Sequence, residues 1–279
     1  MTHTRREFLK KTLAGITGAY VISGSQLLAA QPAYLPKKAI QFRFAVASDG
    51  HFGQPDTPFQ QDHSNLVQWI NREKQDKGLD VCIINGDLIH DKPELLPEVK
   101  TYFDKLTMPY YTTRGNHDRV DGQTWQQTWG YGLNHDVVLK EHAFILTDTS
   151  NEKGEYLCVD LEWLEQRLNH YRNKRNVFVF MHITPNKWTQ NGIDCPELRK
   201  IMEAHPNVKA IFHGHDHDMD MIKETGNKPY IFDGHFGGSW GVDYKGYRIV
   251  EIDKKGNIFT YQFNPAVAPV VNSGWLQKA

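Results

Sequence analysis

Short runs of apolar residues alternate with amphipathic segments along most of the chain. From residue 42 onward, runs of four to seven residues rich in Val, Ile, Phe or Tyr predict buried strands. Apolar residues at helical spacing, such as Leu161, Leu164 and Leu168, predict helices between them. This alternation predicts a layered α/β domain. The predicted strands are 42–48, 80–85, 110–113, 143–146, 177–181 and 208–212, and the predicted helices are 65–77, 93–106, 161–172 and 196–205.

The C-terminal part of the chain changes character. Segments 230–233, 247–252 and 257–263 have the composition of strands, with little helix between them. The Asp-Lys-Lys-Gly sequence at 253–256 predicts a hairpin turn, so we expect an antiparallel section to close the domain. No Pro-rich or Ser-rich linker, repeat or low-complexity tract interrupts the sequence between residues 42 and 263. We therefore expect residues 31–279 to form a single domain.

The first thirty residues have the plan of an export signal. Arg5 and Arg6 lie in a basic head, nineteen uncharged residues follow from Thr12 to Ala30, and small residues come next. Glycine, serine and threonine interrupt the uncharged stretch, which suits a signal better than a membrane span. The paired arginines and the Phe-Leu-Lys that follows resemble a twin-arginine signal, which the twin-arginine export machinery recognises. We predict a signal peptide at residues 1–30; an uncleaved anchor and an ordinary amphipathic start are the alternatives.

Charge and composition argue against several classes of protein. The chain has 279 residues, with 32 Lys and Arg against 33 Asp and Glu. Loss of residues 1–30 removes four basic residues and one acidic residue, so the net charge changes from −1 to −4. We expect no nucleic-acid partner, because binding to a phosphate backbone needs an excess of Lys and Arg. An aromatic content of 12% argues against a disordered or fibrous protein. The sequence predicts a soluble periplasmic or secreted protein with no stable membrane span in its mature form.

The three cysteines show no metal-binding or redox spacing. They are Cys82, Cys158 and Cys195, and an odd number leaves at least one unpaired in an exported protein. Cys82 lies in the apolar run 81–84, so we expect it to be buried.

Polar residues with ligand chemistry follow the predicted strands, at the point where each strand ends. Because sites in α/β sheets form outside the carboxyl ends of the strands, these residues can converge on one place. They offer carboxylate, amide and imidazole donors, a mixture that suits Mn, Fe or Zn better than Ca, which prefers oxygen alone. We expect the glycines at 50, 86, 115 and 214 to let the backbone turn sharply beside each ligand. In chain order the motifs are Asp49-Gly50-His51, Gly86-Asp87, Gly115-Asn116-His117-Asp118, His182 and Gly214-His215-Asp216-His217.

This ordered series, spread from residue 42 to the final strands, resembles the calcineurin-like metallophosphoesterase superfamily. The resemblance implies a four-layer α/β/β/α sandwich with a site for two divalent or trivalent metal ions (Mn, Fe or Zn). It also implies that Asp87 bridges the two ions. The implied ligands are Asp49, His51, Asp87 and His217 for one metal, and Asp87, Asn116, His182 and His215 for the other.

The activity that the resemblance implies is hydrolysis of small-molecule phosphate mono- or diesters by attack of metal-bound hydroxide. His117 is not among the implied ligands, and we expect it to act as the general acid that protonates the departing alkoxide. Arg114 precedes Gly115, and this Arg-Gly-Asn-His sequence resembles the phosphoprotein phosphatase branch, in which that arginine binds the phosphate. A surface arginine at the end of a strand is the alternative for Arg114.

One position departs from the family pattern. Many relatives have a carboxylate three residues after the bridging aspartate, often paired with the catalytic histidine, whereas this chain has His90 there and Asp91 next. Purple acid phosphatases have a tyrosine ligand at this position, so by that criterion the chain is not one of them. Two alternatives stay open: Asp91 takes over the pairing with His117, or His90 lies behind the ligands or contacts a metal.

Two other functions compete with a phosphoesterase. One is a metal-binding scaffold on the same fold that has lost catalysis and binds a partner, although the presence of His117 argues against it. The other is a nuclease, which the acidic mature charge disfavours. Two loops also have alternative roles. Trp125, Trp129 and Tyr131 either stack on a substrate or pack locally, and the Gly-rich segment 234–241 is either a rim loop or a substrate lid.

Overall fold

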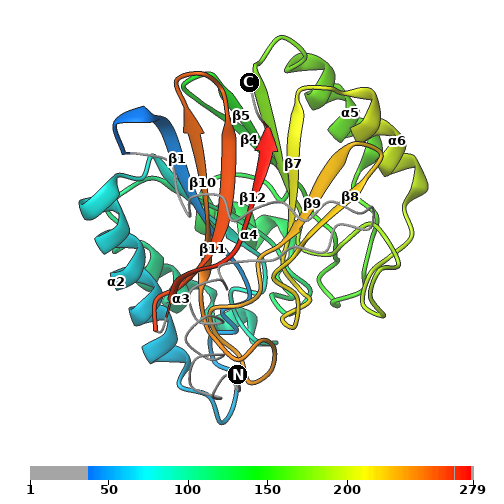
Figure 1. The fold of residues 1–279 in the computed structure, drawn as a ribbon. Helices are drawn as coiled ribbons and strands as arrows, with labels where there is room; N and C mark the ends of the chain where they lie inside the picture. Colours follow the sequence, from blue (N-terminus) through cyan, green and yellow to red (C-terminus); the bar gives the residue numbers. More distant parts are fainter. Residues whose placement is uncertain (1–36, 267, 278–279) are drawn as a thin grey trace, which may run out of the picture.

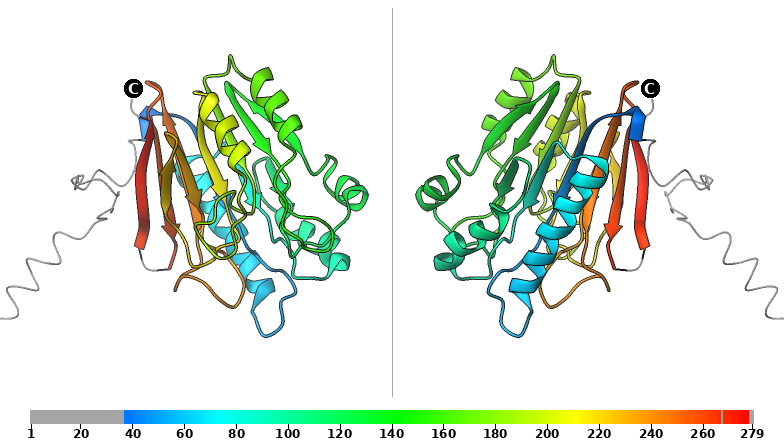
Figure 2. Two further views of the ribbon diagram at one scale, coloured as in Figure 1. Left: turned by 90° about the vertical axis from the view of Figure 1, so that its right-hand side faces the viewer. Right: turned by 90° about the vertical axis from the view of Figure 1, so that its left-hand side faces the viewer.

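The computed structural model describes residues 37–266 and 268–277. The expected signal peptide, residues 1–30, lies outside this part of the chain. Two six-stranded sheets pack face to face, and helices cover the outer side of each sheet (Figure 1). Figure 2 shows the same layers from two sides. The four-layer α/β/β/α sandwich expected from the sequence is confirmed.

The first sheet joins the N-terminal and C-terminal parts of the chain. Strands β1, β2 and β3 run parallel, with β3 at one edge of the sheet, and β10 pairs antiparallel with β1. Strands β11 and β12 extend this antiparallel section, as expected for the C-terminal part. In spatial order the strands are β12 (Ala268–Gln277), β11 (Ile258–Asn264), β10 (Tyr247–Asp253), β1 (Ile40–Ala47), β2 (Val81–Asn85) and β3 (Tyr110–Thr113).

The second sheet comes from the middle of the chain. Its strands β5, β6, β7 and β9 are parallel, and β4 and β8 pair antiparallel at the two edges. In spatial order the strands are β4 (His135–Leu139), β5 (His142–Leu146), β6 (Asn176–Phe180), β7 (Val208–His213), β9 (Lys228–Phe232) and β8 (Ile222–Thr225).

Side chains alternate along the central strands and build the core between the sheets. Phe42, Phe44 and Val46 of β1 point toward the second sheet, whereas Ala45 and Ala47 point toward the helices. The ring of Phe44 lies 5.1 Å from that of Phe144 and 5.0 Å from that of Phe178. Burial of each phenylalanine contributes about 1.5–3 kcal/mol to the stability of the folded protein. The aromatic layer therefore holds in place the strand ends that carry the site.

Helices cover the two outer faces through their apolar sides. Two short 3-10 helices, η1 (Lys37–Ala39) and η2 (Pro93–Leu95), precede β1 and α3. On the first sheet the helices are α2 (Phe59–Lys77), α3 (Leu96–Phe103) and α4 (Gly122–Trp129), and on the second they are α5 (Leu161–His170) and α6 (Pro196–Ala204). Within the described residues, no helix combines the length and the apolar character needed to cross a bilayer.

Several elements differ from the sequence-based prediction. The prediction lacks β4, β8, β12 and α4, and α2 begins six residues before the predicted start at 65. Segment 230–233 is part of a strand, but β9 pairs parallel with β7 instead of joining the antiparallel section. Both faces of β9 are buried, with Tyr230 toward the helices and Ile231 toward the other sheet, which is the environment of a parallel strand.

The cysteines divide into a pair and a single thiol. A disulfide links Cys158, just before α5, to Cys195, at the start of α6. Cys82 is free and fully buried in β2, as its apolar neighbours predicted. The disulfide therefore ties two outer segments of the second sheet to each other.

Candidate metal centre

Seven expected ligands lie in loops that follow parallel strands. Because β1, β2 and β3 end at one edge of the first sheet, and β6 and β7 end at the matching edge of the second, the loops meet between the sheets. Hydrogen bonds join the loops directly, for example from the backbone N–H of His215 to both carboxylate oxygens of Asp49 (3.1 and 3.0 Å). The loops supply Asp49 and His51 after β1, Asp87 after β2, Asn116 after β3, His182 after β6, and His215 and His217 after β7.

Asp49, His51 and His217 form the first donor cluster. Their ligand atoms lie within 4.8 Å of one another. Nε2 of His217 is 2.9 Å from Nε2 of His51 and 3.1 Å from Oδ1 of Asp49. Donors about 2.0–2.2 Å from one shared cation stand about 3 Å apart, so this spacing fits a metal ion. All three side chains are buried, which keeps competing water away from the donors.

Asp87, His182 and His215 form the second donor cluster, beside Asn116. Nε2 of His182 lies 3.1 Å from Oδ2 of Asp87, and the same oxygen is 3.6 Å from Nε2 of His51 in the first cluster. Asp87 therefore stands between the two clusters, where a bridging ligand is expected. Nε2 of His215 and Oδ1 of Asn116 are buried and make no hydrogen bond within the described residues. Buried polar atoms without a partner are unfavourable, and a metal ion would satisfy both.

The backbone holds two of these rings in one orientation. Nδ1 of His182 lies 2.8 Å from the carbonyl oxygen of Asn85, and Nδ1 of His217 lies 3.0 Å from that of Trp240. A carbonyl oxygen can only accept, so Nδ1 of each ring carries the proton. Nε2 of each ring is thereby directed at the donor cluster, which is the usual arrangement of metal-binding histidines.

The ligands themselves, and not the glycines beside them, make the sharp turns. Asp49, His51, Asp87 and His215 have left-handed φ angles of 61°, 48°, 51° and 66°. Of the four glycines expected to turn, only Gly86 has a positive φ. The expectation about turning is therefore wrong at positions 50, 115 and 214. Glycine is needed there for space, because a side chain at these positions would press against His63, Asp87 or Asp49.

Charge inside the site shifts the pKa values of its members in opposite directions. Burial opposes ionisation of Asp49, but His217 and His182 outweigh it and lower the pKa of Asp49 to about 2. Burial also disfavours protonation of His182, yet Asp87 and Asp49 raise its pKa to about 10. Burial lowers the pKa of His51 to about 3 and that of His215 to about 4. Metal binding must therefore displace a proton from His182, while His51 and His215 are already neutral.

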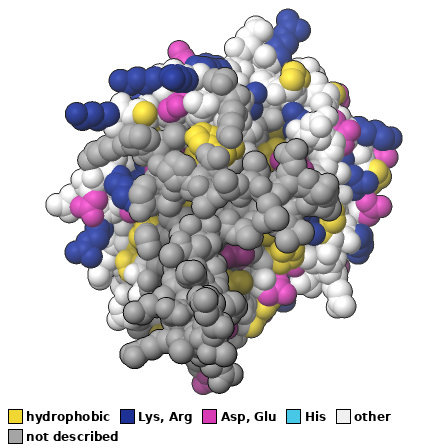
Figure 3. Space-filling model, viewed as in Figure 1, with side chains coloured by type: hydrophobic (Ala, Val, Ile, Leu, Met, Phe, Trp, Pro, Cys, Tyr) yellow, Lys and Arg dark blue, Asp and Glu magenta, His cyan; other side chains and the backbone are white. Residues whose placement is uncertain are grey.

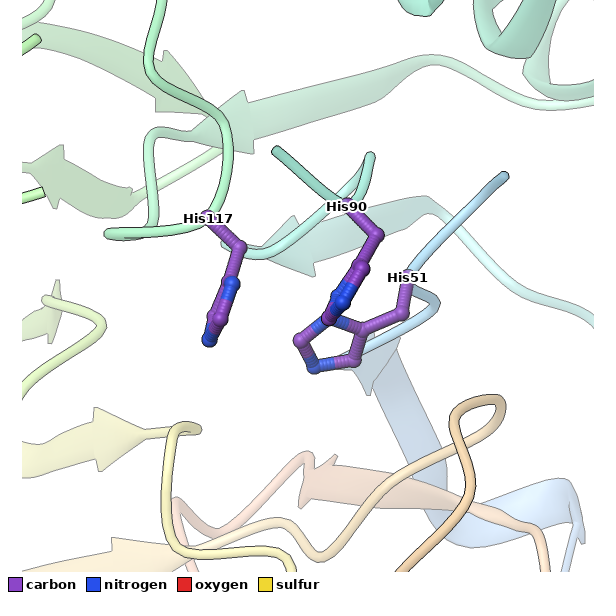
Figure 4. Close-up of side chains that lie close together, drawn as sticks. All are labelled: His51, His90 and His117. Carbon is purple, nitrogen blue, oxygen red and sulfur yellow. The ribbon is translucent and has the colours of Figure 1, made fainter. Parts of the chain in front are cut away.

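His117 lies at the rim of the clusters, with about a third of its side chain exposed. Its backbone N–H donates to Oδ1 of Asp87 (2.8 Å), and its Nδ1 lies 3.1 Å from Oδ1 of Asp91. Arg119 also pairs with that Asp91 oxygen at 2.6 Å. Asp91 thus takes the pairing with His117, while the ring of His90 stacks on His117 at 4.8 Å and 11° (Figure 4).

The position of Arg114 contradicts one of the two alternatives for this residue, that of a surface arginine. It is only 3% exposed, so it is not a surface residue. Its guanidinium donates to both carboxylate oxygens of Asp148 (3.2 and 2.5 Å), to the carbonyl oxygen of Val120 (2.5 Å) and to that of Ser150. These bonds engage all three guanidinium nitrogens and brace the loop after β3, which leaves Arg114 poorly placed to bind a phosphate.

The aromatic residues of α4 pack locally. Trp125 and Trp129 are buried in the core beneath the first sheet. The hydroxyl of Tyr131 accepts a hydrogen bond from the backbone N–H of Thr112 (3.0 Å). The alternative in which these rings stack on a substrate is therefore not supported by their positions.

Two aromatic residues that the sequence did not single out as site residues lie against expected ligands. The ring of Trp240 lies flat on that of His217, at 4.0 Å and 1°, and Tyr156 stands edge-on to His215 at 4.8 Å. Trp240 belongs to the Gly-rich segment 234–241, whose backbone donates to the carbonyl oxygens of Ser48 (3.1 Å) and Asp49 (3.0 Å). This segment is anchored to the ligand loop, and a pocket of about 600 Å³ opens beside it. The sequence signal that could have identified Trp240 is a tryptophan within a glycine-rich segment.

Comparison with known proteins agrees with this geometry. The family model for calcineurin-like phosphoesterases matches residues 42–219, which is more than half of the chain. A dimetal phosphatase from Danio rerio is similar in fold, with a TM-score of 0.69 and 12% identity over 86% of this chain and 100% of that one. A purple acid phosphatase from yellow lupin (Lupinus luteus) has a TM-score of 0.64 and 14% identity over 86% of this chain and 54% of that one. A search of curated protein sequences gave no match. The chain belongs to the calcineurin-like phosphoesterase family.

Proposed function

We propose that this protein is an exported phosphoesterase that uses two metal ions to hydrolyse a phosphate ester. The observation that carries the proposal is the convergence of buried carboxylates and imidazoles into two donor clusters whose ligand atoms lie within 4.8 Å of one another. Family membership supports the general activity. The mixture of oxygen and nitrogen donors supports ions such as Mn, Fe or Zn.

Asp87 is the residue shared by the two ions in this proposal, because it lies within reach of both clusters. When bound, two ions lower the pKa of a shared water and stabilise the charge of an in-line displacement at phosphorus. The ligands we assign are Asp49, His51, Asp87 and His217 for one ion, and Asp87, Asn116, His182 and His215 for the other.

His117 supplies the general acid in this proposal. Asp91 accepts a hydrogen bond from Nδ1–H of His117, which leaves Nε2 to deliver a proton to the departing alkoxide. A general acid of this kind is worth about 10²–10⁴ in rate. The pairing of His117 with Asp91 supports an active enzyme over a scaffold that has lost catalysis.

We propose a small-molecule phosphoester as the substrate. On the part of the face in Figure 3 that is not drawn in grey, Lys and Arg side chains are interspersed with Asp and Glu. This mixture of charges lends no support to a nucleic-acid substrate, which would favour a continuous basic surface. The net charge of −4 expected after removal of residues 1–30 points in the same direction.

Export by the twin-arginine route remains part of the proposal. The Cys158–Cys195 disulfide supports export itself, whatever the route, because disulfides persist in oxidising compartments such as the periplasm. An exporter of folded proteins would let this chain acquire its metals in the cytoplasm, before it meets competing ions. Metal analysis of the cytoplasmic precursor tests that order of events; a precursor free of metal would contradict it.

A substrate panel tests the activity. The protein would be reconstituted with Mn, Fe or Zn and assayed with p-nitrophenyl phosphate, bis-p-nitrophenyl phosphate and nucleotides. We expect hydrolysis that needs the metal and that disappears when Asp87 or His215 is replaced. An enzyme that binds the metals but hydrolyses none of these esters would favour the scaffold instead.

A further inference from the structure

The outer nitrogen of His51 faces another imidazole. His182 and His217 donate Nδ1–H to backbone carbonyl oxygens, but Nδ1 of His51 lies 3.0 Å from Nδ1 of His90. Figure 4 shows the His51 and His90 rings side by side, with His117 next to His90. His90 therefore occupies the place that a carbonyl oxygen takes behind the other two rings.

Hydrogen-bond chemistry fixes which ring carries the proton between them. Nε2 of His51 lies 2.9 Å from Nε2 of His217, inside the first donor cluster. If this Nε2 binds a metal, neutral His51 must carry its proton on Nδ1. Nδ1 of His90 is then the acceptor, and neutral His90 carries its own proton on Nε2.

Backbone hydrogen bonds fix the position of His90 beside His51 and His117. Its backbone N–H donates to the carbonyl oxygen of Phe52 (2.9 Å), which lies next to His51 in sequence. The next backbone N–H, of Asp91, donates to the carbonyl oxygen of His117 (2.9 Å). The His90 ring lies nearly parallel to that of His117, so one side chain touches both an expected ligand and the expected acid.

We propose that His90 is a positioning residue that accepts the Nδ1–H of His51, directs Nε2 of His51 at the metal, and supports the ring of His117 by stacking. The inference rests on the proposed function, since it treats His51 as a ligand. A carboxylate at position 90 would accept the same hydrogen bond from His51 but would offer no flat ring to stack on His117. In this chain the two tasks are divided, with Asp91 pairing with His117 and His90 supporting both rings.

Two substitutions separate the hydrogen bond from the ring. His90→Phe keeps a flat ring against His117 and removes the acceptor for His51. His90→Asn keeps an acceptor at nearly the position of Nδ1 and removes the ring. We expect His90→Phe to weaken binding of Zn²⁺ or Mn²⁺ about 10- to 100-fold, as loss of an outer partner of a ligand does. His90→Asn should retain metal affinity close to that of the wild type and lower kcat with little change in KM.

Titration calorimetry with the metal alone and nitrogen-15 spectra of the imidazoles read out the result on the full chain. Wild-type protein with Zn²⁺ bound should show His51 protonated on Nδ1 and His90 protonated on Nε2, a measurement that needs no variant to fold. The opposite tautomer, or equal metal affinity in His90→Phe and wild type, would overturn the inference. A third metal equivalent that disappears in His90→Phe would also overturn it, since His90 would then be a ligand. Failure of the wild type to bind a second ion would instead count against the proposed function, and the tautomer of His51 in the form with one ion bound would still test His90.

Discussion

Gly214 offers a sharp test of how closely the two donor clusters are packed. It precedes His215, and a Cβ added at Gly214 would lie 2.5 Å from Oδ2 of Asp49 and 2.9 Å from Nδ1 of His182, and would also meet Oγ of Ser48. These three side chains are at most 1% exposed, so they have no free space into which to retreat. Gly214→Ala therefore perturbs a ligand of each cluster without removing a donor atom.

The size of the effect follows from the distances. Ordinary contact begins at 3.4 Å, so Asp49 would have to move by about 0.9 Å and His182 by about 0.5 Å. Metal-ligand distances are held to within about 0.2 Å, so both sites would lose their geometry. We expect metal affinity to fall by more than about 100-fold, beyond the loss of an outer partner. Crowding should also lower the free energy of unfolding by about 1–3 kcal/mol.

Calorimetric titration with Zn²⁺ or Mn²⁺ measures the first effect, and urea unfolding of the metal-free protein measures the second. Gly122→Ala is the matched control, because its Cβ would lie 3.5 Å from Leu133, an ordinary contact at the start of a helix. The control should bind metal and unfold like the wild type. Two ions bound by Gly214→Ala with wild-type affinity would refute the packing argument.

Four further predictions concern separate parts of the proposal. His117→Ala should keep both metals and lose about 10²–10⁴ of kcat on an ester with a poor leaving group; full activity would remove its acid role. Arg114→Leu should destabilise the fold by about 3–5 kcal/mol in urea unfolding, since it breaks a buried pair, whereas a raised KM with unchanged stability would restore its role in phosphate binding. Because the pKa of His182 is raised to about 10, metal binding at pH 8 should release a proton and metal affinity should rise with pH; calorimetry in two buffers that shows no release would contradict this. Replacing Arg5 and Arg6 together by lysine should leave precursor in the cytoplasm, as fractionation would show, and normal export would discredit the signal.

The ends of the central strands were predictable because a buried strand has a continuous apolar sequence. Central strands such as β2 and β6 are apolar on both faces, and polar residues begin where each of them ends. The parallel order of these strands then brings the motifs to one edge. Edge strands lack this continuous apolar sequence: β4 is only partly buried, and β8 has four residues. The sequence of β12 mixes apolar residues with Asn, Ser and Gly, so its pattern did not predict a strand.

The roles of individual side chains depended on partners far away in sequence. Nothing near Arg114 shows that it is buried, because its partner Asp148 is 34 residues away. The position of Trp240 against His217 depends likewise on how a loop returns to the site. The two alternatives at His90 and Asp91 needed coordinates as well, since adjacent residues point at different rings. The local sequence pattern predicted which side chains could come into contact, and tertiary packing determines which of them do.

The left-handed backbone at four ligands has a consequence for how this chain can change. Non-glycine residues in that conformation cost of order 1–3 kcal/mol each, less for aspartate than for bulkier side chains. Glycine at position 49, 51, 87 or 215 would relieve that cost and delete a donor at the same time. The carboxylates and imidazoles in these four turns thus stand where the backbone alone favours glycine. Interactions of their side chains, such as the backbone hydrogen bonds that Asp49 and Asp87 accept, must offset that preference, so a variant that relaxes one of these turns loses a metal donor and a contact between loops together.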